Sequence, residues 1–585
     1  MTAQAVSDYL SVDVVVVGSG AAGLSAAIRA AAGGLRVLVL EKTAFFGGST
    51  AISGGVVWIP ANSAMVEQGA ADSRAAARIY LQQTLGEKFR PHLIDAFLSH
   101  GPAMVDFFNS RTEVQLAPRM YGPDYHSELP GASNGGRGLD PLMFDGRRLG
   151  KWFARLRPAL PQMTIFGGMM VSRYDIDHLT HAWKRWPSFL HSVAILARHL
   201  RDRLTYPRGT RLLAGNGLAA RLLKSALDSG VELRSGVKVT ELVSEQGRVA
   251  GVVASLEGRL MRIRASRGVV LASGGFAANP ELAARHLKYP DQHLSMAPEG
   301  STGDGLRLAT SIGAMLGTGN ANPAFLTPVS VFEKNGGGQV RFPHLILDRQ
   351  KPGLIAVNSE GKRFVNEADS YHDFVEGMYR SHVQVPSIPA YLLCDSRFIR
   401  RYGLGLARPW PFSHRYLQRS GYLIKAPTLA QLAAALVIPE AALLRTVESN
   451  NANAASGIDE EFGRGSTEYN RYLGDPDHTP NPCLGTISQP PFYAVRVYPG
   501  DIGTATGLVT DEKSRVLGAS GVAIPGLYAC GNDMNSIMAG HYPAGGITLG
   551  PAMTFGYIAA GELLGERDSS GAREEPLAET GGKGG

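Results

Sequence analysis

The N-terminal part of the chain alternates short apolar runs with glycine-rich turns. A β-branched run at 12–17 ends in a turn at 18–23, an alanine-rich segment follows to residue 32, and a second apolar run covers 36–40. Short apolar runs bounded by glycine are typical of buried strands, and alanine favours a helix. The pattern predicts a strand, turn, helix and strand unit of the α/β class.

The turn at 18–23 has the spacing GxGxxG, and the second strand is followed by an acid, Glu41. In a Rossmann-like unit the first glycine makes the turn, the second lets the backbone approach a pyrophosphate, and the third packs the helix on the sheet. The acid accepts hydrogen bonds from ribose hydroxyls. We therefore predict a dinucleotide site formed by Gly18, Ser19, Gly20, Ala21, Ala22, Gly23, Glu41 and Lys42.

A second loop rich in glycine and serine follows at 46–55. It is longer than a plain NAD-binding fold needs, so we expect it to lie over the rest of a bulkier cofactor. The residues that it would contribute are Gly48, Ser49, Thr50, Ser53, Gly54 and Gly55.

Further apolar runs with glycine exits lie far along the chain, at 237–242, 269–276 and 526–533. Their return to one sheet implies a discontinuous cofactor domain with a second domain inserted in it, as expected for a chain of 585 residues. The limits that we predict are 1–285 and 490–565 for the two parts of the cofactor domain, 286–489 for an α+β substrate domain, and 566–585 for a disordered tail.

The candidate chemistry lies in the loop 540–551, which leads into a helix with Pro551 in its first turn. The free N–H groups and positive dipole end of that helix would point back into the loop. Tyr542 precedes Gly546 by four residues, so a phenol and a bare amide can converge on one carbonyl oxygen. The alternative is a tight connection that contains a packed aromatic.

Composition narrows the function. The formal charge of +7 is spread without a basic run, which does not point to nucleic acid. Three separated cysteines predict neither disulfides, a zinc site nor a c-type haem, so no metal is expected. The first 13 residues lack the features of a signal peptide, and no apolar stretch reaches the roughly 18 to 20 residues that span a bilayer. We expect a cytoplasmic protein.

These motifs occur in an order that resembles a known superfamily. The GxGxxG, the 48–55 loop, Ser273-Gly274-Gly275, the run 302–305, the run 361–367 and the last glycine-rich helix together resemble the flavoproteins of fumarate reductase and succinate dehydrogenase. More narrowly they resemble the 3-ketosteroid dehydrogenases. The resemblance implies an FAD cofactor and adds to its site the residues Val239, Ser273, Gly274, Asp304, Gly531, Asn532, Thr548 and Leu549.

The resemblance also discriminates between substrates. Fumarate reductases carry an arginine where this chain has Pro543, and without it the loop lacks the bidentate donor that a carboxylate requires. Tyr542 and Gly546 match instead the ketone-binding pair of the ketosteroid enzymes. Tyr371 matches their proton-accepting tyrosine, and Tyr125 matches a helper tyrosine, although the spacing around Met120 and Tyr121 departs from the family pattern.

The implied reaction is desaturation of ring A at C1–C2, in which Tyr371 takes the C2 proton and a hydride passes from C1 to flavin N5. Ala544 lacks the hydroxyl that the related Δ4-dehydrogenases use, which favours C1–C2 over C4–C5, while Ile547 is bulkier than the usual residue. Without a haem or iron–sulfur ligand set in the sequence, a separate acceptor such as a quinone is expected. The alternatives are a Δ4-dehydrogenase, a fumarate-reductase-like enone reductase, and a flavin module without turnover.

The segment 141–210 is the least familiar and predicts a helical insertion. Within it, 163–204 mixes aromatic, aliphatic and basic residues, including Trp183, Lys184, Arg185 and Trp186. Such a mixture is typical of an interfacial helix that touches a membrane surface. An amphipathic helix packed on the protein body accounts for it as well.

Overall fold

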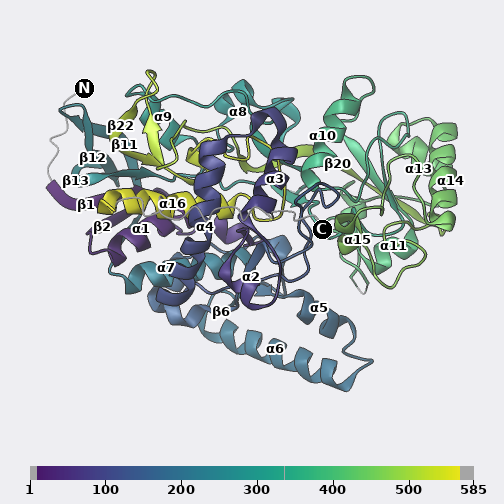
Figure 1. Ribbon diagram of the computed structural model, residues 1–585. Helices are drawn as coiled ribbons and strands as arrows, with labels where there is room; N and C mark the ends of the chain where they lie inside the picture. The colour runs from purple at the N-terminus through teal and green to yellow at the C-terminus, as the bar shows by residue number, and fades with distance from the viewer. Residues whose placement is uncertain (1–8, 335, 411, 567–585) are drawn as a thin grey trace, which may run out of the picture.

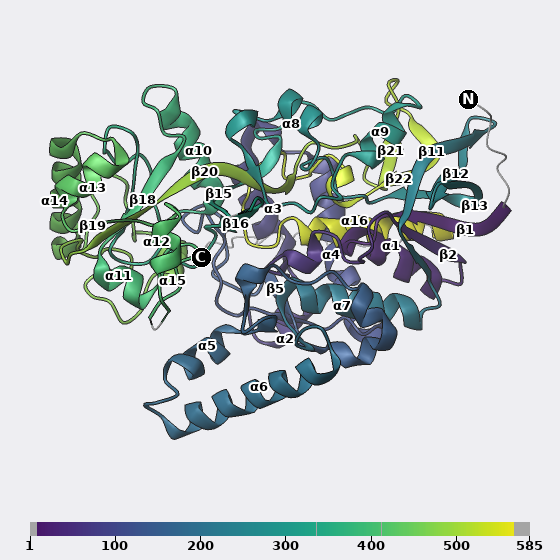
Figure 2. The ribbon, with the colours of Figure 1, turned by 180° about the vertical axis from the view of Figure 1, so that it is seen from behind.

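Two large sheets lie at opposite ends of the molecule (Figures 1 and 2). The computed structural model describes residues 9–334, 336–410 and 412–566. One sheet is built largely from the N-terminal half of the chain, and the other from residues 294–504. The C-terminal segment then returns to the first sheet.

The first sheet has eight strands within the described residues, and its core order is β10-β2-β1-β13-β12-β11. β1 lies parallel to β2 and β13, whereas β12 and β11 continue the sheet antiparallel. β22 joins β13 from the far end of the chain, as predicted for a discontinuous sheet. The strands are β1 (Tyr9–Val17), β2 (Val37–Glu41), β10 (Glu232–Ser235), β11 (Val237–Glu245), β12 (Arg248–Leu256), β13 (Arg259–Leu271), β21 (Arg515–Leu517) and β22 (Ala523–Ala529).

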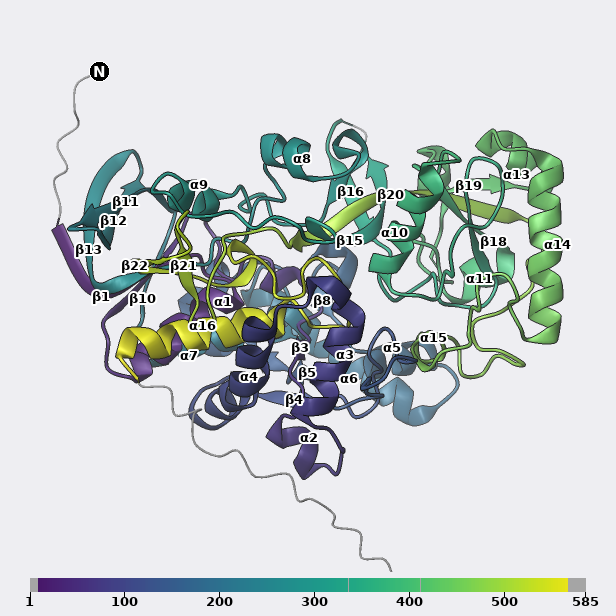
Figure 3. The ribbon, with the colours of Figure 1, turned by 45° about the horizontal axis from the view of Figure 1, so that its top comes forward.

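Helices cover this sheet, and the last helix packs on the first, α16 on α1 (Figure 3). The contact needs small residues, since a Cβ at Gly556 would lie 2.4 Å from the Ala22 carbonyl oxygen. The helices of this part are α1 (Ala21–Ala32), α2 (Ser63–Glu67), α3 (Arg74–Leu85), α4 (Pro91–Arg111), α7 (Ala214–Asp228), α8 (Pro280–His286), α9 (Asp304–Thr310) and α16 (Leu549–Leu564).

The second sheet has seven strands within the described residues, with the 13-residue β20 pairing to β14, β15, β18 and β19. β20 begins after residue 489, so the limit predicted for the inserted domain does not coincide with this sheet. The first residues of β20 contain no glycine, so the sequence pattern did not mark this strand as part of the second sheet. The strands are β14 (Leu294–Ser295), β15 (Ala324–Glu333), β16 (Gln339–Pro343), β17 (Leu354–Val357), β18 (Ala390–Cys394), β19 (Ile424–Ala426) and β20 (Phe492–Thr504).

Six helices belong to this second part within the described residues, and α10 packs on β15. Their buried faces close two apolar clusters, one on each side of the sheet. They are α10 (Tyr371–His382), α11 (Ser396–Arg401), α12 (Arg415–Arg419), α13 (Leu429–Leu436), α14 (Glu440–Ser456) and α15 (Glu468–Leu473).

The remaining strands of the described residues form three small sheets. β3 (Val57–Trp58), β5 (Gly138–Pro141) and β4 (Leu116–Pro118) form one of them beside the first large sheet. β6 (Phe144–Asp145) pairs with β9 (Arg211–Leu212), and β7 (Thr164–Ile165) pairs with β8 (Met169–Met170). The β6–β9 pair brings the two ends of the segment predicted as an insertion side by side.

Between β6 and β9 the chain forms a helical hairpin that projects from the body (Figures 1 and 2), made of α5 (Arg173–Thr180) and α6 (Trp186–Thr205). The buried residues of α6 are Ser188, Ser192, His199 and Asp202. Some of its large apolar side chains are exposed and others are half-buried, so membrane contact and packing on the body both remain predictions for α6. No helix within the described residues is long and apolar enough to span a bilayer.

The described chain ends at Glu566, whose carboxylate accepts hydrogen bonds from Arg29 of α1 at 2.9 and 3.0 Å. The remainder of the predicted tail, 567–585, lies outside the described residues.

Candidate functional site

The GxGxxG turn connects β1 to α1. Gly18 has φ +109°, and a Cβ there would lie 2.2 Å from the Ala272 carbonyl oxygen, so only glycine fits this turn. Glu41 ends β2, and one of its carboxylate oxygens accepts a hydrogen bond of 2.6 Å from the Ser19 hydroxyl. Its other oxygen accepts from the amide and hydroxyl of Thr43, both at 2.9 Å. The acid is therefore fixed beside the turn.

The second glycine-rich loop lies directly on this turn. The Thr50 hydroxyl oxygen accepts a hydrogen bond of 2.9 Å from the Ala21 amide at the start of α1. A Cβ at Gly48 would lie 3.6 Å from the Gly20 Cα, which leaves the two backbones close together without a clash. The loop thus brings Gly48, Ser49, Thr50, Ser53, Gly54 and Gly55 to the end of the first sheet, beside Gly18, Ser19, Gly20, Ala21, Ala22 and Gly23.

The remaining predicted cofactor residues surround the same end of the sheet. Lys42 pairs with Asp304 at 2.5 Å, at the start of α9. The Ser273 amide, just after β13, donates to the Asp533 carboxylate, which joins the turn after β13 to the turn after β22. Gly274 follows with φ +95°, and Val239 is buried in β11, which contacts β2 and α9.

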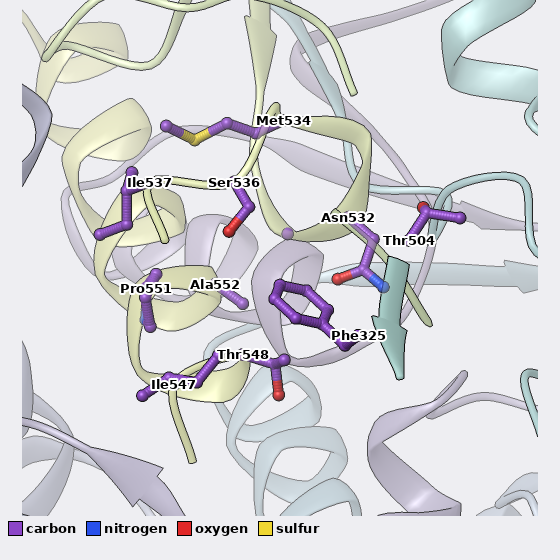
Figure 4. A pocket seen from close by; sticks show the side chains of 11 residues that line it. Phe325, Thr504, Asn532, Met534, Ser536, Ile537, Ile547, Thr548, Pro551 and Ala552 are labelled. Carbon is purple, nitrogen blue, oxygen red and sulfur yellow. The ribbon is translucent and has the colours of Figure 1, made fainter. Parts of the chain in front are cut away.

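A cavity opens where these turns meet the start of α16. The polar side chains of Thr504, Asn532, Ser536 and Thr548 stand among apolar ones in its wall (Figure 4). A cavity with mixed polar and apolar walls, next to a helix N-terminus, suits the edge of a flat, partly anionic ring such as a flavin. Its lining residues are Phe325, Thr504, Gly531, Asn532, Met534, Ser536, Ile537, Ile547, Thr548, Pro551 and Ala552.

Three predicted tyrosines from distant segments form one cluster. The ring centroids of Tyr371 and Tyr542 are 5.1 Å apart, and Tyr125 lies 5.8 Å from Tyr371 and 5.7 Å from Tyr542. The Tyr125 hydroxyl donates a hydrogen bond of 3.2 Å to the Tyr371 hydroxyl. Only 5% of Tyr542 and 6% of Tyr371 is exposed, so the cluster excludes bulk water.

Burial controls the ionisation of these phenols. It raises the pKa of Tyr371 well above its usual value, and the neighbouring Tyr125 and Tyr542 raise it further. Burial also raises the pKa of Tyr542, while hydrogen bonds to Tyr371 and Thr548 oppose that shift. One feature favours ionisation at Tyr371, because this residue begins α10 and so lies at the positive end of the helix dipole.

The loop 540–551 is fixed by its backbone. The Pro543 carbonyl accepts hydrogen bonds from the Tyr80 hydroxyl at 2.6 Å and from the Tyr125 amide at 2.8 Å. The Gly546 carbonyl accepts from the Trp58 amide at 3.2 Å, and a Cβ at Gly546 would lie 2.8 Å from that Trp58 nitrogen. With φ +103°, Gly546 must be glycine. No described residue accepts a hydrogen bond from its amide, which leaves that donor for a ligand.

Several residues around the cluster were not predicted from the sequence. Tyr469 of α15 packs against Tyr125 with ring centroids 4.5 Å apart and ring planes tilted by 41°, and Phe325 of β15 meets Tyr542 edge-on at 5.6 Å. His372 lies 6.0 Å from Tyr542 and accepts from the Leu326 amide. None of these lies in a recognisable motif. Asp533 could have been predicted from the sequence, since it directly follows Gly531 and Asn532 of the predicted cofactor site.

Comparison with known proteins decides the family. A model of the FAD binding domain matches residues 13–549. A 3-oxosteroid 1-dehydrogenase of Mycobacterium tuberculosis is 39% identical over 94% of this chain and 97% of its own length. The chain belongs to the 3-ketosteroid dehydrogenase family of FAD-binding proteins.

One further curated relative and one solved structure are similar to this chain over nearly its full length. A 4-oxocyclohex-2-ene-1-carboxylate 5-dehydrogenase of Sinomonas cyclohexanicum is 37% identical over 95% of this chain and 94% of its own. The crystal structure of the 3-ketosteroid Δ1-dehydrogenase of Sterolibacterium denitrificans superimposes with a TM-score of 0.88 at 36% identity, covering 95% of this chain and all of that one.

Membership confirms the predicted FAD cofactor and the fold of the fumarate reductase and succinate dehydrogenase flavoproteins, with mixed sheets and helices. The turns, the 46–55 loop and the cavity would hold FAD between them, since they provide the dinucleotide turn, a fixed acid and space at a helix N-terminus. The individual contacts remain predictions.

We predict that Glu41→Ala weakens FAD binding by roughly tenfold or more, because a hydrogen bond to a charged group contributes about 1.5 to 3 kcal/mol. The measurement is titration of the apoprotein with FAD, followed by flavin fluorescence. Glu333→Ala, at an exposed acid of the second sheet, is the control and should bind like the wild type. A colourless protein that ignores FAD and binds NAD would contradict the assignment of this turn.

Proposed function

We propose that this protein desaturates ring A of a 3-ketosteroid at C1–C2. The observation that carries the proposal is a cluster of three tyrosines, two of them buried, beside the loop whose Gly546 amide has no partner among the described residues. A carbonyl bound there would have donors on its oxygen and a proton acceptor close by. The named activities of the Mycobacterium and Sterolibacterium relatives support this choice.

Tyr542 and Gly546 bind the ketone oxygen. A C–H beside a ketone becomes acidic enough for a side chain only if the negative charge that develops on the oxygen is stabilised. Both donors are fixed before the substrate arrives, because Pro543 and Gly546 are anchored through their carbonyls to Tyr80 and Trp58. The buried site raises the strength of these hydrogen bonds.

Tyr371 accepts the proton from C2. Its phenol is held by the Tyr125 hydroxyl at 3.2 Å, so Tyr125 can stabilise the phenolate and pass the proton on. The start of α10 adds a favourable field, typically about 0.3 to 1 kcal/mol. Bound FAD supplies the acceptor for the hydride from C1. The electrons then leave to a separate acceptor such as a quinone.

One residue of the loop, Ala544, supports the C1–C2 position, whereas Ile547 is the departure from the family pattern. Ala544 and Ile547 are 2% and 1% exposed, so both face the protein interior. Ala544 has no hydroxyl with which to shift the ketone as in a Δ4-dehydrogenase. The Sterolibacterium enzyme was solved with 1,4-androstadiene-3,17-dione, a product with the C1–C2 double bond.

A small cyclic keto acid is the second candidate substrate, since the Sinomonas relative acts on 4-oxocyclohex-2-ene-1-carboxylate. Such a substrate needs a cation for its carboxylate. Arg119 is the arginine whose charge acts on Tyr125. Its guanidinium is already paired with Asp140, at 2.6 and 2.9 Å. This pairing favours the uncharged steroid.

The finer domain division is also part of the proposal. A discontinuous Rossmann-like FAD domain would comprise the first sheet with α1 and α16, and a substrate domain would comprise the second sheet. Because β20 is central to the second sheet, we place the end of the substrate domain near Thr504 instead of residue 489.

The α5–α6 hairpin would contact a membrane surface. Trp183 and Trp186 are 90% and 69% exposed, and Leu204 is 86% exposed at the other end of α6. Lys184 and Arg185, both exposed, lie between the two tryptophans. Exposed indoles beside basic side chains suit an anionic lipid surface, and a poorly soluble steroid would be collected there.

Androst-4-ene-3,17-dione tests the reaction. We expect conversion to the 1,4-diene with reduction of a dye, because the C4–C5 bond of this substrate is already unsaturated. The product is identified by mass and ultraviolet spectra. 4-Oxocyclohex-2-ene-1-carboxylate and fumarate serve as comparison substrates and should turn over at least about tenfold more slowly. Consumption of a 5α-saturated ketone alone, giving the 4-ene, would overturn the regiochemistry.

Tyr542→Phe and Tyr371→Phe should both retain FAD and lose most turnover. Removing an oxyanion donor typically costs about 10² to 10³ in rate, and removing a general base about 10² to 10⁴. Tyr493→Phe, at a buried tyrosine of the second sheet, should keep the wild-type rate.

The pH dependence separates the two roles. Burial raises the pKa of Tyr371 well above its usual value, so its basic form becomes more abundant as pH rises, and the wild-type kcat should increase through the alkaline range. The residual rate of Tyr371→Phe should lose that increase, whereas Tyr542→Phe should keep it. The same slope in both variants would exclude Tyr371 as the base.

Binding to liposomes tests the hairpin. The wild type should sediment with liposomes that contain anionic lipid, and Trp183→Glu with Trp186→Glu should reduce the bound fraction severalfold. Val437→Glu changes a residue that is 87% exposed after α13, at the far end of the second sheet, and should bind normally. Membrane contact through α6 would be contradicted if all three proteins sedimented with the liposomes to the same extent, or if none of them sedimented.

A further inference from the structure

Arg90 reaches the outer side of the cavity wall from the residue just before α4. Its Nη1 donates a hydrogen bond of 2.8 Å to the carbonyl oxygen of Ser536, which lines the cavity. Its Nη2 donates one of 2.7 Å to the side-chain oxygen of Asn320. The guanidinium is thus separated from the cavity by a single peptide layer.

The charge of Arg90 is not compensated. All of its hydrogen-bond partners are neutral, and no described carboxylate forms an ion pair or a hydrogen bond with it. Burial alone lowers its pKa, with no charged neighbour acting on it. Arg137 and Arg363, which are also buried, each bind two carboxylates, whereas Arg208 and Arg221 are bound only by neutral oxygens, as Arg90 is. A partly buried cation without a counterion costs stability, and Arg90 differs from Arg208 and Arg221 in lying beside the cavity.

We propose that Arg90 favours the reduced, anionic form of the flavin and thereby sets its reduction potential. The inference rests on the assignment of the cavity to the flavin ring. A fixed positive charge in a low-dielectric wall stabilises negative charge on the other side of it. The start of α16 acts in the same direction from another side of the cavity. Arg90 acts on the flavin through its electrostatic field and is not a catalytic residue, since it contacts Ser536 and not the flavin ring.

The alternative role is mechanical, because the same two hydrogen bonds join the start of α4 to the loop around Ser536. Charge and connection can be separated by substitution. Arg90→Lys keeps the charge and loses the fork of donors, whereas Arg90→Gln keeps a donor and loses the charge. Asn320→Asp keeps Arg90 and neutralises it with a carboxylate.

The test is the midpoint potential of the bound flavin, measured by reductive titration with a reference dye. Arg90→Gln and Asn320→Asp should both lower the equilibrium constant for reduction by about tenfold, which is about 30 mV for a two-electron couple. Arg90→Lys should stay close to the wild type. Arg221→Gln is the matched control, because Arg221 is a buried arginine bound by the carbonyls of residues 113, 142 and 143 outside the cavity. Its potential should not change.

The proposal is overturned if Arg90→Gln and Asn320→Asp keep the wild-type potential, whether or not FAD retention or the melting temperature falls. If Arg90 variants fail to fold, Asn320→Asp decides alone. Failure of the proposed reaction is a separate outcome, since it would appear as absent steroid turnover in the wild type whatever the potentials of the variants.

Discussion

The loop 540–551 is held by contacts with the N-terminal part of the chain and with α10 of the second part, and the site depends on this. Its carbonyls accept hydrogen bonds from Tyr80, Trp58 and the Tyr125 amide, all from the N-terminal part. Its tyrosine packs against Tyr371, which lies in the second part. If the loop moved, the ketone donors, the proton acceptor and the start of α16 would lose their alignment together. A displacement of about 1 Å is enough to slow such chemistry markedly.

The dinucleotide unit could be predicted from the sequence because its requirements are local. Gly18 and Gly20 are dictated by backbone approach, and Glu41 by its position after a strand, so each leaves a mark within a few residues. The tyrosine cluster is different. Tyr542 could be identified from the loop around it, whereas Tyr125 and Tyr371 required the family resemblance, because nothing in the local sequence indicates that they meet.

Other features could not be predicted because they arise from long-range packing. Tyr469 becomes a neighbour of Tyr125 only when α15 folds against the N-terminal part. The lack of a counterion at Arg90 is a property of everything around it. The exposed apolar side chains of α6 were hidden by its periodicity, since an amphipathic pattern specifies two faces without specifying which one is buried. In α6 serine, histidine and aspartate take the buried side.

The β6–β9 pair has a consequence for how this protein can vary. The α5–α6 hairpin begins and ends beside this pair, because Arg211 pairs with Asp175 at 2.7 Å and the Thr210 hydroxyl donates a hydrogen bond of 2.7 Å to Asp202. A segment with adjoining ends can be lengthened or shortened at the cost of loop-closure entropy alone, which grows slowly with length. The projecting hairpin can therefore change independently of the rest of the protein during evolution. It can be gained, lost or exchanged between relatives while the catalytic body keeps its architecture.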